Sequence, residues 1–169
     1  DLTLAGLSAA AVDQLELRNA LSSDRTHLRA SLLPGLMRAV VDNLRHTSNL
    51  RLMEFGRVFE PRPQTVSEQR HVAGVLVEEL ATGLAPQGGE FYVLKGVIEA
   101  LADRLGIRDL KFERPRALTP IWHAGRTAQI LAGGQVVGLV GELAPRWRQA
   151  PKIIKRAAEQ GVSIHALTQ

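Results

Sequence analysis

The chain has 169 residues, 45% of them hydrophobic, and a formal net charge of +4 from 21 Lys and Arg against 17 Asp and Glu. It contains no cysteine, which excludes disulfides, thiolate metal sites and a cysteine nucleophile. No apolar run approaches the roughly 20 residues of a membrane-spanning helix, and the first residues lack the features of a signal peptide, so a cytoplasmic protein with no membrane partner is expected.

The first residues predict short elements. Ser8 is a suitable N-cap for a short helix that runs to Leu15. Residues 15–18 then alternate apolar and polar side chains, as a short strand does, and residues 19–23 are polar and turn-like. Because the first residue is not Met, we expect the chain to be a piece of a longer protein.

The strongest helix pattern follows Ser31, which is the expected cap. Apolar side chains recur there with the spacing that forms one stripe along a helix, and Pro34 is tolerated because it falls in the first turn. The stripe comprises Leu33, Leu36, Met37, Val40, Val41 and Leu44.

Two strands are predicted next. Residues 51–60 are apolar on both faces, which is typical of an inner strand, and Pro61 and Pro63 should end it because proline donates no ladder hydrogen bond. Residues 71–79 form a second β pattern.

The second half predicts another helix and several strands. The helix stripe consists of Phe91, Leu94, Val97, Ile98, Leu101 and Leu105. Gly106 should end this helix in a left-handed conformation. A short strand is expected at 110–113, and Gly133-Gly134 between two β patterns predicts a hairpin. Residues 145–160 appear as a helix broken at Pro151, and 162–168 as a last strand.

This order of elements predicts an α+β fold, with an antiparallel or mixed β-sheet flanked by helices. The length fits one domain over residues 1–169, in which 1–18 form a leading helix and strand and 19–169 form the core.

A search for chemistry finds no catalytic, cofactor-binding or metal-binding residues to predict. The five histidines are scattered without metal-ligand spacing, and the glycines form neither a dinucleotide fingerprint nor a phosphate loop. The densest cations are Arg146, Arg148, Lys152, Lys155 and Arg156, and a solvated face is the simpler interpretation of them.

Five separate segments together resemble the β subunit of bacterial phenylalanyl-tRNA synthetase. The segments, called here the family blocks, are residues 19–36, 54–59, 91–101, 123–126 and 137–145. They include Leu-Arg-Ala-Ser-Leu-Leu-Pro-Gly-Leu in the first block, Glu-Phe-Gly-Arg-Val-Phe in the second and His-Ala-Gly-Arg in the fourth. Alanine at 20, 124 and 144 departs from the family pattern.

The resemblance implies a fold like the catalytic domain of class II aminoacyl-tRNA synthetases. In the β subunit this domain would be a copy without catalytic activity. ATP and magnesium would then be used by the α subunit, and this domain would need no cofactor. In the family, first-motif helices join the subunits, and the helix at 34–45 stands where such a helix is expected. We therefore predict a subunit interface at Leu33, Leu36, Met37, Val40, Val41 and Leu44, with part of the stripe exposed.

The expected partners are the α subunit and, through the whole enzyme, tRNA(Phe). The isolated domain could also self-associate through the same stripe. Three functions remain open: a non-catalytic assembly module, a basic tRNA-binding module without an assembly role, and an enzyme with an unrecognised site.

Overall fold

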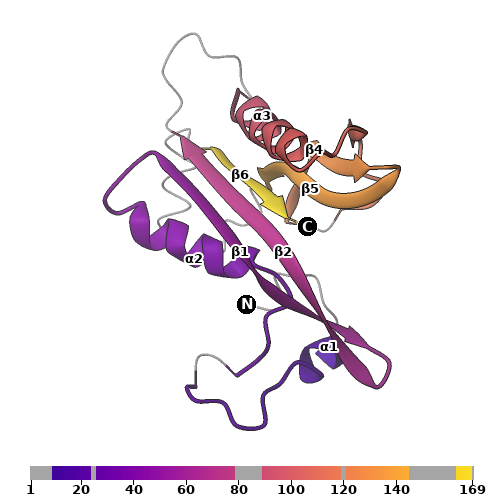
Figure 1. The fold of residues 1–169 in the computed structure, drawn as a ribbon. Coiled ribbons are helices and arrows are strands. Elements are labelled where there is room, and N and C mark those ends of the chain that lie inside the picture. Colours follow the sequence, from indigo (N-terminus) through magenta and orange to yellow (C-terminus); the bar gives the residue numbers. More distant parts are fainter. Residues whose placement is uncertain (1–8, 24–25, 79–88, 119–120, 145–162, 169) are drawn as a thin grey trace.

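A computed structural model describes residues 9–23, 26–78, 89–118, 121–144 and 163–168. It is an α+β fold in which helices flank one antiparallel sheet, as predicted (Figure 1). The elements are α1 (Ala9–Asp13), α2 (Leu33–Asn43), β1 (Leu50–Arg62), β2 (Thr65–Glu78), α3 (Gly89–Arg104), β3 (Leu110–Glu113), β4 (Trp122–Ala132), β5 (Gln135–Leu143) and β6 (Ser163–Thr168). No helix in the described part of the chain is long and apolar enough to span a membrane.

The sheet has six strands in the order β1-β2-β6-β5-β4-β3, and every neighbouring pair is antiparallel. The last strand in sequence, β6, therefore lies in the middle of the sheet, where it joins the β1–β2 hairpin to β5. β1 and β3 are the two edges. The predicted strand at 162–168 is confirmed, although its central position was not foreseen.

Helix α2 packs on one face of the sheet. Its buried side chains join those of alternate β2 residues, such as Val75 and Val77, in a cluster that Trp122 and Leu143 extend. The Ser31 hydroxyl accepts a hydrogen bond from the N–H of Leu33 at 3.2 Å, which supports its predicted capping role, although the N-cap position itself is occupied by the next residue.

Helix α3 packs on the opposite face. Leu94 and Ile98 contact a second cluster that contains Leu76 of β2, whose side chain points away from α2 because successive strand residues alternate. Three members of its predicted stripe are exposed: Val97 at 57%, Leu101 at 40% and, just after the helix, Leu105 at 66%. The apolar side of α3 is thus less completely buried against the sheet than its periodicity predicted.

The β1–β2 hairpin differs from the prediction. The prolines at 61 and 63 were expected to end the strand, but β1 continues to Arg62 and β2 starts at Thr65. The intervening turn places Gln64 at φ 67°, a left-handed conformation that fits a type II turn after proline. Gly133 and Gly134 have φ values of 57° and 80°, so the predicted hairpin between β4 and β5 is confirmed.

The leading segment is less regular than expected. Helix α1 ends at Asp13, and the strand predicted at 15–18 is reduced to a single antiparallel bridge between Glu16 and His27. The cap predicted at Ser8 and the broken helix predicted at 145–160 lie outside the described residues. The division of residues 1–169 as one domain stays a prediction.

Candidate functional site

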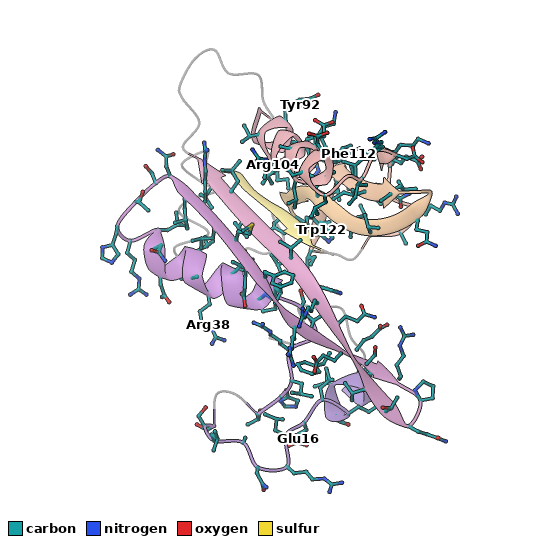
Figure 2. The ribbon with its side chains drawn as sticks, in the orientation of Figure 1. Glu16, Arg38, Tyr92, Arg104, Phe112 and Trp122 are labelled. Carbon is teal, nitrogen blue, oxygen red and sulfur yellow. The ribbon has the colours of Figure 1, made fainter. Side chains whose placement is uncertain are left out.

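The predicted interface stripe lies inside the domain. Leu33, Leu36, Met37, Val40 and Val41 are at most 9% exposed, and Leu44 is partly buried against the same cluster. The expectation that part of the stripe stays exposed is wrong for the first five side chains, which pack against the domain's own sheet, whereas Leu44 keeps partial exposure. The opposite side of α2 is polar, and Figure 2 shows Arg38 on that side. Contact between the stripe and another subunit stays a prediction.

A first joint is built by Arg29 between the first two family blocks. Its Nη1 donates to Glu54 Oε1 at 2.5 Å and its Nε donates to the carbonyl of Arg57 at 2.7 Å. Its own carbonyl accepts a hydrogen bond from the N–H of Phe59 at 2.9 Å. Hydrogen bonds from this one arginine thus hold the segment before α2 against the outer edge of β1.

Glycine at position 56 makes room for this joint. A Cβ built there would lie 2.2 Å from Nη2 of Arg29 and 3.2 Å from Cδ2 of Leu32. The guanidinium therefore lies directly on the backbone of β1. Because the side chains of Arg29 and Glu54 are 46% and 33% exposed, the ion pair itself contributes little, and the two hydrogen bonds to backbone groups fix the geometry.

A second joint connects the fourth and fifth family blocks. Arg126 Nη1 lies 2.6 Å from Glu142 Oε2, and the Glu142 side chain is only 12% exposed. The register between β4 and β5 shifts between Trp122 and Thr127, so residues 123–126 bulge opposite Glu142. Arg126 therefore supplies the charge partner that a mostly buried carboxylate requires.

Gly141 is the close-approach position beneath this bulge. A Cβ there would lie 2.6 Å from the carbonyl oxygen of Arg126 and from Thr127 Oγ1. By contrast, a Cβ at Gly125 would meet only the His123 ring, at 3.7 Å, and Gly125 does not have positive φ. Gly125 therefore lies within β4, which starts at Trp122 and passes through the bulge, and not in a turn with positive φ.

The third and fourth family blocks meet at a surface hollow of about 500 Å³ between α3 and the end of β3. Tyr92 of α3 and Phe112 of β3, both labelled in Figure 2, are among the residues that line it. Lys95 Nζ lies 5.3 Å above the Phe112 ring and 3.4 Å from Glu99 Oε1, so its charge is already engaged. The described lining of the hollow combines aromatic and charged groups.

The described residues hold no group of three or more His, Asp or Glu that could bind a metal ion. His123 accepts the N–H of Gly125 at 3.1 Å, and His71 lies 3.2 Å from Gln69, so both rings have local partners. The cations predicted at 146–156 lie outside the described residues.

Sequence reasoning missed both joints. Arg29 and Glu54 are 25 residues apart, and Arg126 and Glu142 are 16 apart, so neither pair has a local pattern. The only available signal was that each partner falls within a family block.

Comparison with known proteins agrees with the family blocks. Residues 3–158 match the family model described as phenylalanyl tRNA synthetase beta chain CLM domain. The phenylalanine–tRNA ligase beta subunit of Lactiplantibacillus plantarum is 37% identical over 149 residues, which cover 85% of this chain and 18% of that relative. The corresponding subunit of Moorella thermoacetica is 35% identical over 147 residues, with the same coverage of both chains. This chain therefore spans less than a fifth of the length of these relatives, and it belongs to the family of phenylalanyl-tRNA synthetase beta chain CLM domains.

Proposed function

We propose that this chain is a structural module, without a catalytic site of its own, in the β subunit of a phenylalanine–tRNA ligase. In this role it supports assembly with the α subunit, which binds ATP and magnesium, and it serves tRNA(Phe) through the whole enzyme. An antiparallel sheet flanked by helices is compatible with the class II synthetase-like core that the resemblance implies.

The observation that supports this proposal is that charged side chains of the family blocks form ion pairs and hydrogen bonds with one another. Arg29 binds Glu54 and the backbone of β1, and Arg126 binds Glu142. On β1, Arg57 lies 2.9 Å from Glu68, so this guanidinium is also engaged within the chain. The resemblance implies that β1 stands where active class II domains carry a phosphate-binding arginine, and in this chain Arg57 of that strand pairs with Glu68.

The alternative of a basic tRNA-binding module depends on the cations at 146–156. Since these residues lie outside the described part of the chain, no contact or distance supports a phosphate groove there. We therefore keep the structural module as the proposed function.

The test uses the complete β subunit with its α subunit. Arg126→Ala should lower the thermal midpoint of the complex, because it leaves Glu142 mostly buried without its partner. The kcat and KM of the assembled fraction should stay within about twofold of wild type. Loss of an interaction that does not contact the transition state changes neither constant. Arg108→Ala is the matched control, because Arg108 is exposed and makes no ion pair with a described residue.

A catalytic role would give a different result. Loss of a group that stabilises transition-state charge lowers kcat by about 10² or more, even in a fully assembled and stable complex. Such a loss for Arg126→Ala, or phenylalanine-dependent pyrophosphate exchange by this chain alone, would contradict the proposal.

A further inference from the structure

Strand β1 forms one edge of the sheet, and its hydrogen bonds show which residues face outward. The N–H of Phe59 donates to Arg29 and the carbonyl of Arg57 accepts from Arg29, so both residues direct their backbone groups away from β2. The register with β2 is unbroken from Leu50 to Arg62. Because antiparallel strands alternate inward and outward residues, Met53 and Phe55 also direct their N–H and C=O groups outward.

At these two residues the edge of the sheet is not covered by another described strand. Their four outward backbone groups have no hydrogen-bond partner among the described residues. The two residues are 74% and 67% exposed, and their side chains lie on the α3 face because they pair with Gly74 and Val72 of β2. A long edge strand with large exposed apolar side chains is normally covered or blunted in soluble proteins.

Charge near this edge indicates what would cover it. Arg57 pairs in register with Arg70 of β2, so both lie on the face of Phe55. Glu68 neutralises Arg57, and Arg70 is exposed with no ion pair to a described residue. The edge therefore combines two apolar side chains with excess positive charge, which complements a strand that carries acidic residues beside its apolar ones.

We propose that the Met53–Phe55 edge accepts an added β-strand from another region of the same β-subunit polypeptide. The added strand would have apolar side chains at alternate positions and an acidic side chain near Arg70. The inference rests on the proposed function, since the matched region covers only 18% of two relatives and leaves most of their length available to supply it. Alternating free N–H and C=O groups are the pattern that strand addition satisfies.

A second copy of this chain fits the edge less well. Antiparallel pairing of two β1 edges about Glu54 would bring Met53 opposite Phe55, which is favourable. It would offer no acidic side chain to complement Arg70, because the β1 residues on the face of Phe55 are Arg51, Met53, Phe55, Arg57 and Phe59.

The experiment measures hydrogen exchange of individual backbone amides in the β subunit alone and in the α/β complex. The amides of Met53 and Phe55 should exchange at least about tenfold more slowly than unstructured peptide amides in both samples, because each would donate to the added strand. Exchange at the unstructured rate would overturn the inference. An assembled complex with normal aminoacylation would in that case leave the proposed function standing.

A proline variant separates strand addition from general stability. Phe55→Pro removes one outward N–H without removing a β1–β2 hydrogen bond, and the native Pro61 occupies an equally outward position of the same strand. The variant should restore fast exchange at Met53 while the amides of β2 stay protected. Slow exchange that persists at Met53 would contradict strand addition, and so would protection that requires tRNA, the α subunit or dimerisation.

Discussion

The close approach of Gly141 to β4 gives a sharp test of the second joint. In Gly141→Ala, the new Cβ would lie 2.6 Å from the Arg126 carbonyl oxygen and 2.7 Å from the Cα of Thr127. Both distances are well below the 3.0 Å that real Cβ contacts keep, and both obstacles are backbone atoms that cannot rotate aside. The bulge must therefore move away from β5, and this movement strains the Arg126–Glu142 pair.

The expected cost follows from this geometry. Overpacking by one methyl group costs about 1–3 kcal/mol, and we expect about 2–3 kcal/mol because the obstacles are backbone. In a chain of this size, that loss lowers the thermal midpoint by about 4–12 °C. Circular dichroism during thermal and urea unfolding measures both quantities.

Two other glycines are matched controls for Gly141→Ala. A Cβ at Gly125 meets nothing closer than 3.7 Å, so Gly125→Ala should change stability by less than about 0.5 kcal/mol. Gly96 lies within α3 and a Cβ there meets nothing within 4 Å, so Gly96→Ala should stabilise by about 0.5–1 kcal/mol. If Gly141→Ala were as stable as wild type, the packing described for the bulge would be wrong.

Other substitutions test the core and the turn through the midpoint of urea unfolding. Leu36→Ala should destabilise by about 2–5 kcal/mol because Leu36 is only 5% exposed in the α2 cluster, whereas Asp42→Ala on the exposed side should change stability by less than about 0.5 kcal/mol. Equal effects would contradict the orientation of α2. Gln64→Gly should stabilise by up to about 1 kcal/mol, because glycine adopts φ 67° without steric cost. A loss of stability there would contradict the left-handed turn.

Local signals in the sequence predicted the elements they control. Gly106 ends α3 with φ 74°, and Gly133-Gly134 forms the β4–β5 turn. The rule that proline ends a strand does not predict the hairpin of β1 and β2, in which β1 continues to Arg62. Pro61 is compatible with β1 since its position faces the free edge, where no ladder hydrogen bond is required.

The role of the α2 stripe could not be decided from periodicity. Spacing identifies the apolar face of a helix, but any apolar surface can cover that face, whether a sheet of the same domain or a helix of another chain. The buried positions of Val40 and Met37 show that the domain's own sheet covers it here. The prediction that residues 51–60 form an inner strand is wrong, because β1 is an edge of the sheet and Met53 is 74% exposed.

The central position of β6 explains why the helices and strands could be predicted from the sequence but the order of strands in the sheet could not. The β1–β2 and β4–β5 hairpins each form from neighbouring segments, yet they join only when β6 pairs with Gly74 on one side and Val140 on the other. The α2 cluster also spans this junction, because Val77 of the first hairpin and Trp122 of the second pack together in it. Each of these contacts closes a long loop, and its entropic cost has no local signature in the sequence. The Arg29 joint has the same character, because it holds together residues 25 apart that no local pattern connects.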